Sequence, residues 1–261
     1  CKTPIAWFDN IPLISWLLLG AKCRHCSQPI SWQYPLVEAL TGVLFFCVYW
    51  RFGFTIATPV YMLYAAALVV VTFQDLADWT IPNEITFPGI PLGLVLALVG
   101  MAWPDSGLRV TDIFDALLGI VLGGGILYTL DRVTVLVLKK PGMGFGDVKL
   151  LAMIGAFLGW QGVLGTLMMA SVVGSAVGIA MILYFRAKPA STPAEAPVVD
   201  TASPAPSASA SSASPADEED EVITLEGHYL PFGPYLALGG LLFMFFGPEL
   251  IAWYFGTISL A

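Results

Sequence analysis

Long apolar runs without a charged residue limit how this chain can fold. Residues 53–74, 85–104 and 150–185 contain no Asp, Glu, Lys or Arg. A membrane-spanning helix needs about 20 consecutive, mostly apolar residues, and each of these runs is long enough. Only 11% of the 261 residues are charged, whereas soluble domains carry about 25%. The sequence therefore predicts an all-α polytopic membrane protein in a lipid bilayer, and no nucleic acid partner is expected.

Seven stretches are apolar enough to form transmembrane helices. We expect a very tight turn near Gly162 to Gly165, between the fifth and sixth stretches, and a break at Gly247-Pro248 in the last one. The chain opens on Cys1 and not on Met, so we expect a preceding segment that carries one more span. Cys1 could instead be a lipidated N-terminal residue. The seven predicted spans are 35–51, 57–74, 84–103, 112–132, 148–164, 166–186 and 230–255.

The placement of Lys and Arg predicts the orientation, because cytoplasmic loops carry an excess of both residue types. If residues 1–34 are cytoplasmic, nine of the 11 basic residues fall on the cytoplasmic side. Only Arg51 and Arg109 fall on the opposite side. The nine are Lys2, Lys22, Arg24, Arg132, Lys139, Lys140, Lys149, Arg186 and Lys188. This bias places residues 1–34, 75–83, 133–147 and 187–229 in the cytoplasm.

Four regions follow from this topology. Residues 1–34 form a small cytoplasmic domain with a Cys motif, residues 35–186 form a six-helix core, and residues 230–261 hold the last span. Between the core and the last span, residues 187–229 are rich in Ala, Ser and Pro and contain an acidic run. Such a stretch buries too little apolar surface to fold, so we interpret it as a disordered cytoplasmic linker. A docking tail is the alternative.

Pairs of small residues four positions apart recur along the predicted spans. Such pairs let helix backbones approach closely in a membrane. We therefore predict close helix packing at these positions. The pairs are Gly89/Gly93, Gly119/Gly123, Gly155/Gly159 and Gly174/Gly178.

Two carboxylates stand at the ends of predicted spans. Asp147 begins the fifth span and Asp75 ends the second, so by the parity of the spans both lie on the cytoplasmic side. An ionisable group at the edge of an apolar span is a functional-site hypothesis by default. Two aspartates held close together can serve as base and acid for the attack of water on an amide, sharing one proton between them. The sequence therefore indicates a catalytic pair.

The residues around Asp147 suit such a pair. Gly144 and Gly146 have no Cβ and would let the backbone of a bound peptide lie against the site. Lys149 lies two residues further on and is expected to tune or orient the pair. The alternative is that both aspartates are ordinary helix-end residues. That alternative fits Asp147, which begins a helix, but it fits Asp75 poorly, since a negative charge is disfavoured where a helix ends.

The cysteines near the N-terminus have the spacing of a metal site. Cys23 and Cys26 are separated by two residues, and Cys1 lies upstream. A structural zinc ion takes four ligands, commonly as two close pairs, and three cysteines are present here. A disulfide is the alternative, although a cytoplasmic location disfavours it. Cys47 lies inside an apolar span and is expected to serve packing.

Several motifs resemble those of one enzyme family. Gly144-Phe145-Gly146-Asp147 resembles the GxGD signature of intramembrane aspartyl proteases, and residues 143–150 resemble its form in bacterial type IV prepilin peptidases. Asp75-Leu76, followed by Ile81-Pro82, resembles the first-aspartate motif of that family. Further landmarks occur in the family order: Asn10-Ile11-Pro12 with Ser15-Trp16, Cys23-Arg24-His25-Cys26, Pro29-Ile30-Ser31, Tyr34-Pro35-Leu36-Val37-Glu38 and Pro231-Phe232-Gly233-Pro234.

This resemblance implies an aspartyl endopeptidase of the bacterial inner membrane. Its substrates would be type IV prepilins or type II secretion pseudopilins, cleaved after a Gly at the cytoplasmic face, with Asp75 and Asp147 as the catalytic residues. Many members then N-methylate the new N-terminus with S-adenosylmethionine. The family pattern has two CxxC pairs, which implies that Cys1, Cys23 and Cys26 are zinc ligands with a fourth upstream.

The sequence departs from the family pattern at a few places. Asn83 replaces a common Asp, and residues 187–221 are an insertion before the last span. Two other functional classes stay open beside the peptidase. One is a transporter that uses Asp75 and Asp147 as proton or cation sites, and the other is a catalytically silent assembly protein of a pilus or secretion system.

Overall fold

The structure is a computed structural model that describes residues 4, 9, 11, 13–139, 144–187 and 231–258. Cys1 and all of the predicted linker except Ala187 lie outside the described residues. The chain forms two compact units, Cys1–Ala176 with Pro231–Ala261, and Val177–Leu230. The described part of the second unit is the last few turns of one helix.

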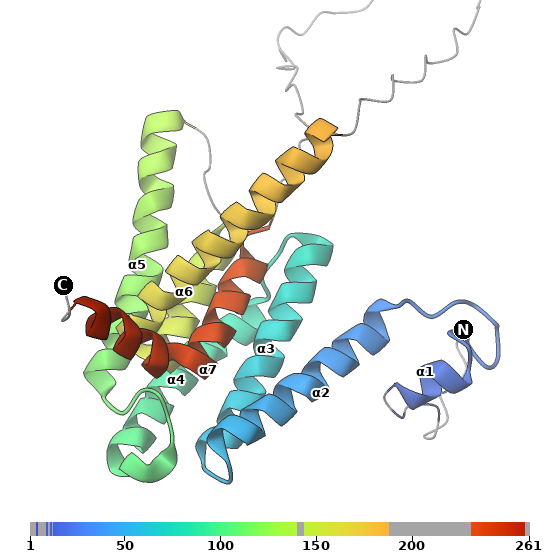
Figure 1. Ribbon diagram of the computed structural model, residues 1–261, viewed down its shortest axis with the longest axis horizontal. Helices are drawn as coiled ribbons and strands as arrows, with labels where there is room; N and C mark the ends of the chain where they lie inside the picture. Colours follow the sequence, from blue (N-terminus) through green and yellow to red (C-terminus); the bar gives the residue numbers. More distant parts are fainter. Residues whose placement is uncertain are drawn as a thin grey trace, which may run out of the picture. The chain divides into compact units, whose positions relative to one another are not determined.

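Helices account for all the named elements in the described part of the chain (Figure 1). Six of them are long and apolar enough to cross a membrane, which confirms the prediction of an all-α polytopic membrane protein. The elements are α1 (Ile14–Leu18), α2 (Gln33–Phe52), α3 (Ala57–Asp78), α4 (Asn83–Ala102), the short 3₁₀ helix η2 (Pro104–Ser106), α5 (Ile113–Leu138), α6 (Phe145–Ala187) and α7 (Gly233–Ile258).

The fifth and sixth predicted spans are joined in α6, which breaks at one residue. Gly159 has φ 72° and ψ −176°, a combination that essentially only glycine adopts. The expected turn at Gly162 to Gly165 is therefore wrong in position, because those residues are helical. Six long helices are present in the described ranges, and the break at Gly159 divides α6 into two, which correspond to the fifth and sixth of the seven predicted spans.

The two parts of α6 on either side of Gly159 run in opposite directions along α7. In the first part, Gly146 and the start of α7 both pack against Ile81. Further along, Ile154 lies against Gly240. In the second part the order is reversed, since Gly174 faces Tyr235 and Thr166 faces Gly239. The single break at Gly159 thus makes α6 a helical hairpin, which is the tight turn that the sequence predicts, placed a few residues earlier.

Asp115, in the first turn of α5, stabilises this turn from outside. Its carboxylate packs where a Cβ on Gly159 would lie, and its Oδ1 accepts a hydrogen bond from the backbone N–H of Trp160 at 3.4 Å. The free N–H groups that begin a helix favour a negatively charged partner. The break is therefore capped by a residue from a different span.

Replacement of Gly159 by alanine is expected to destabilise the fold. The backbone conformation costs a non-glycine residue about 1–3 kcal/mol, and the added Cβ would overlap the Asp115 carboxylate. The matched control is Gly125→Ala in α5, where a Cβ meets nothing within 4 Å. Thermal unfolding in detergent micelles should show a lower melting temperature for G159A only. Equal melting of both variants would contradict the turn.

The first part of α6 is the centre of the bundle. Residues 150–159 are all buried, as is expected for a helix that is hydrophobic on every side. Glycines of neighbouring helices make the close approaches: Gly93 of α4 faces Ala156, and Gly119 of α5 faces Gly155. These contacts confirm the close packing predicted for the first three small-residue pairs. Asp147 therefore begins a helix that is held on several sides.

The last helix passes through Pro248 and does not end there. A break at Gly247-Pro248 is thus not found, because α7 extends to Ile258 with the proline inside it. Figure 1 shows that the ribbon of α7 bends along its C-terminal half. An internal proline bends a helix because it removes one backbone hydrogen bond and its ring crowds the carbonyl four residues earlier.

Candidate active site

Asp75 and Asp147 are the two buried acidic side chains of the described residues. Asp75 lies in the last turns of α3 and is 6% exposed, and Asp147 lies in the first turn of α6 and is 8% exposed. The nearby acids Asp78 and Glu84 are exposed to the surroundings. Burial of a carboxylate is costly unless it is paired or hydrogen-bonded, so buried acids are rare outside functional sites. This contrast separates the two predicted site residues from ordinary helix-end acids.

The structure brings these two carboxylates together at one end of the bundle. Asp147 lies within the range over which the charge of Asp75 acts. Ile81, in the turn between α3 and α4, joins the surrounding elements. A Cβ on Gly146 would lie 3.0 Å from the Ile81 Cβ, and a Cβ on Gly233 would lie 3.2 Å from its Cδ1. The first residues of α6 and α7 thus meet the end of α3 here.

Gly233 makes the closest approach to Asp75. A Cβ at this position would overlap the Asp75 Oδ2. That oxygen is buried and makes no hydrogen bond of ordinary geometry among the described residues, although the Gly233 N–H lies near enough to the carboxylate to interact with it. An unsatisfied buried carboxylate oxygen is uncommon in proteins, and such groups concentrate at functional sites. The sequence marks Gly233 only as part of a family landmark, so its contact with Asp75 is a finding of the structure.

The pair has the arrangement that acid–base chemistry needs. Two carboxylates held at short range cannot both ionise cheaply, so a pair of this kind can share one proton. In that singly protonated state one carboxylate can accept a proton while the other can donate one. This state is suited to the attack of water on a peptide bond.

The other predicted residues of this segment have distinct places. Gly144 is exposed and its carbonyl accepts a hydrogen bond from the Asp147 N–H at 3.2 Å. Gly146 is half-buried against Ile81. Lys149 donates a hydrogen bond to the Asn83 side chain. Its ammonium lies over the ring of Phe87, 5.2 Å from the centroid. Lys149 thus joins the first turn of α6 to that of α4.

The Cys motif lies in a tight turn ahead of α2. The Cys23 N–H donates to the Gln28 carbonyl at 2.9 Å, and the Ser27 N–H donates to the Cys23 carbonyl at 3.0 Å. Hydrogen bonds from the backbone N–H groups of Cys26 and His25 lower the pKa of the Cys23 thiol to about 7. That shift favours the thiolate, the form that binds metal ions. The turn therefore suits a metal ligand pair.

A complete metal site is not formed within the described ranges. No group of three or more His, Cys, Asp or Glu side chains there can hold an ion. Cys1, the third predicted ligand, lies outside the described residues. In the same part of the chain, Cys23, Cys26 and Cys47 form no disulfide.

Two structural residues of the bundle were not predicted as such from the sequence. Asp115 was not singled out, although an acid in the first turn of a predicted span is a visible signal. The sequence predicts a packing role for Gly159, whereas its backbone conformation reverses the chain. Both residues stabilise the hairpin that begins with Asp147.

Two family models match this chain. The family model described as Bacterial Peptidase A24 N-terminal domain matches residues 1–52, and the model described as Type IV leader peptidase family matches residues 62–179. No solved structure matches the chain.

Several relatives carry the name prepilin leader peptidase/N-methyltransferase. The protein from Myxococcus xanthus is 37% identical, with 96% of this chain and 80% of that protein covered. The protein from Aeromonas hydrophila is 34% identical, covering 97% of this chain and 72% of that protein. The one from Pseudomonas aeruginosa is 32% identical, with coverage of 97% and 72%. At this identity and coverage, the chain belongs to the type IV leader peptidase family.

Proposed function

We propose that this chain is a prepilin leader peptidase in which Asp75 and Asp147 are the catalytic residues. The observation that carries the proposal is that two buried aspartates from α3 and α6 lie close together at one end of the bundle. The names of the relatives supply the substrate class, a prepilin with its leader. Substrates would include type IV prepilins and type II secretion pseudopilins.

The reaction would be a direct hydrolysis. The ionised carboxylate of the pair takes a proton from water, and the water oxygen attacks the carbonyl carbon of the scissile peptide bond. The protonated carboxylate gives its proton to the leaving nitrogen, and the C–N bond breaks. One carboxylate is the base and the other the acid, and each group changes its protonation state once in the cycle. Gly144, which is exposed beside the pair, leaves room for the peptide backbone.

We also propose that the site faces the cytoplasm from a bacterial inner membrane. The excess of Lys and Arg on the Asp75 side supports this orientation. A prepilin helix would then enter from the bilayer between spans, and its basic leader would stay in the cytoplasm. The scissile bond would come to rest at the membrane face, where Asp75 and Asp147 lie.

N-methylation of the new N-terminus is the second activity that we propose, by analogy with the names of the relatives. S-adenosylmethionine would supply the methyl group. A cavity of about 480 Å³ beside the Cys turn is lined by Trp16, Arg24, Tyr34 and Glu38, among others. Small-molecule sites have volumes in this range and combine aromatic walls with a few polar groups. These residues would hold the cofactor.

A single assay tests both activities. Purified protein in lipid is incubated with a prepilin, with and without S-adenosylmethionine, and the product masses are followed over time. We expect loss of the leader in both samples and a gain of one methyl group only with the cofactor. A prepilin that stays intact would contradict the peptidase. Ion-coupled flux through the same liposomes would then point to the transporter.

We further propose a structural zinc ion bound by Cys1, Cys23 and Cys26 with one ligand from upstream. Protein that includes the upstream segment is expected to contain one zinc per chain, measured by metal analysis. The variants Cys23→Ser and Cys26→Ser should lose most of it, whereas Cys47→Ser should keep it. Substoichiometric zinc in fully reduced wild-type protein would contradict the site.

A further inference from the structure

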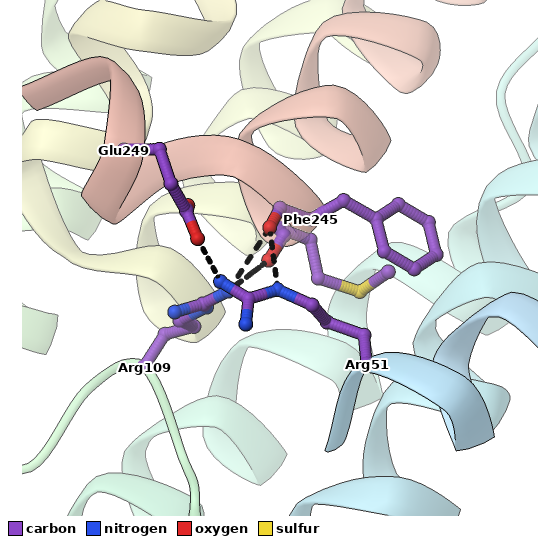
Figure 2. A network of polar contacts seen from close by, with 5 residues as sticks. Arg51, Arg109, Phe245 and Glu249 are labelled. Carbon is purple, nitrogen blue, oxygen red and sulfur yellow. Dashed lines mark hydrogen bonds and ion pairs between the residues drawn. The ribbon is translucent and has the colours of Figure 1, made fainter. Parts of the chain in front are cut away.

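Two arginines lie at the end of the bundle away from Asp75, and both bind α7 (Figure 2). The Arg109 guanidinium donates to the Met244 carbonyl from Nε at 3.0 Å and from Nη2 at 2.8 Å. It also reaches the Phe245 carbonyl, at 3.3 Å. Arg51 donates to the same Phe245 carbonyl at 3.0 Å and forms an ion pair with Glu249.

Pro248 explains why these carbonyls need donors from outside the helix. In an α-helix the N–H of residue 248 would donate to the carbonyl of Met244, four residues earlier. Proline has no N–H, and its ring crowds that carbonyl. Met244 is fully buried, so water does not replace the missing donor. Arg109 supplies it instead.

Arg109 is also tied to α3, the helix that carries Asp75. Its backbone N–H donates to the Tyr61 hydroxyl at 2.6 Å. Tyr61 is 1% exposed and lies in the first turns of α3. The Arg109 guanidinium further lies over the ring of Phe52, 5.1 Å from its centroid. One residue therefore joins the far end of α3 to the bend in α7.

The same two helices meet again at the active site. On α3, Asp75 is 14 residues from Tyr61 (75 − 61), or about 21 Å along the axis. On α7, Gly233 is 11 residues from Met244 (244 − 233), or about 17 Å. Between these ends, a Cβ on Gly240 would lie 2.9 Å from the Tyr64 hydroxyl. Because α3 and α7 are stiff and packed side by side, a shift of α7 along α3 at the Arg109 end is carried to the active-site end.

We propose that Arg109 is a positioning residue for the peptidase. It replaces the hydrogen bond that Pro248 removes and sets how far α7 reaches along α3. In this way it holds Gly233 against Asp75 from the opposite end of the bundle. The inference rests on the proposed catalytic role of Asp75. It adds Arg109 to Gly233 as a residue that determines the geometry around Asp75.

The test combines Arg109 with Pro248. In full-length protein, Arg109→Ala is expected to lower kcat for leader cleavage about 10- to 100-fold, since small misplacements of reacting groups cost that much. KM for the prepilin should stay nearly unchanged. In a Pro248→Ala background the helix supplies its own N–H to Met244, so the further change Arg109→Ala should cost only a few-fold. Arg109→Lys, which keeps the charge and one donor, should restore part of kcat.

Controls separate positioning from folding and from the catalytic assignment. Arg51→Gln also removes a bond to α7 but leaves the tie to α3, and it should change kcat less than about twofold. In a variant that is only less stable, kcat falls by the same factor at every pH. A displaced Asp75 instead changes the shape of the pH–rate profile. An unchanged kcat for Arg109→Ala, or the same loss with Pro248→Ala, would overturn the proposal. Retained cleavage by Asp75→Asn would instead overturn the catalytic assignment.

Discussion

Replacing either Asp75 or Asp147 with asparagine is expected to lower the rate of leader cleavage by at least about 1,000-fold. Positioned acid–base groups contribute about 10²–10⁴-fold each. An amide has nearly the shape of a carboxylate, but it neither accepts a proton from water nor donates one to the leaving nitrogen. The same loss is expected for each variant, because the two groups act as one unit. Leader loss measured by mass over a long incubation gives the rate.

The chain offers matched controls for this loss. Asp78 lies one helical turn after Asp75, and Glu84 lies in the first turn of α4, yet both are exposed. Asp78 accepts a hydrogen bond from Gln74 at 2.8 Å and has no part in the proposed reaction. Asp78→Asn and Glu84→Gln should therefore cleave within about twofold of wild type. If these controls also lost activity, the negative charge of the protein surface around the site would matter, and not the buried pair alone.

Replacing Gly233 with alanine is expected to lower kcat about 100-fold or more. The added Cβ would overlap the Asp75 Oδ2 and would lie 3.1 Å from its Cγ. Either the carboxylate rotates away from Asp147 or the start of α7 moves outward. A displacement of about 1 Å is enough to cost two orders of magnitude in rate. The assay is the same cleavage measurement, made at saturating prepilin.

Gly42→Ala is the matched control for this variant. Gly42 is inside α2, and a Cβ there meets nothing within 4 Å. Alanine at this place should leave cleavage unchanged and should favour the helix slightly. Gly233→Ala with wild-type kcat would contradict the contact between α7 and Asp75. A variant that inserts into the membrane and folds correctly elutes from gel filtration as a single peak, whereas one that does not insert lacks this peak.

The sequence alone predicts the helices and the meeting of the two aspartates. Span length follows from composition, and the common face of Asp75 and Asp147 follows from counting spans. The buried state of both side chains also agrees with their assignment as a pair. These features are predictable because each depends on the local sequence or on the order of the spans.

Contacts between particular residues of two distant segments were mostly not predicted. The reversal at Gly159 needs the carboxylate of Asp115, which lies in another span, and its position within a glycine-rich stretch cannot be read from hydropathy. The contact of Gly233 with Asp75 likewise joins residues 158 apart (233 − 75). The hydrogen bond from Lys149 to Asn83 of α4 was not predicted either. In each case the missing information is which helix faces which.

The pH dependence of kcat tests most directly whether one carboxylate of Asp75 and Asp147 acts as the general base and the other as the general acid. A prepilin peptide without ionisable groups near the scissile bond is used at saturation, between about pH 4 and 9. The proposed mechanism requires one ionised and one protonated carboxylate, so kcat should pass through a maximum and fall on both sides. A rate that rises in one step and stays level at high pH would contradict the shared proton, and with it the catalytic pair.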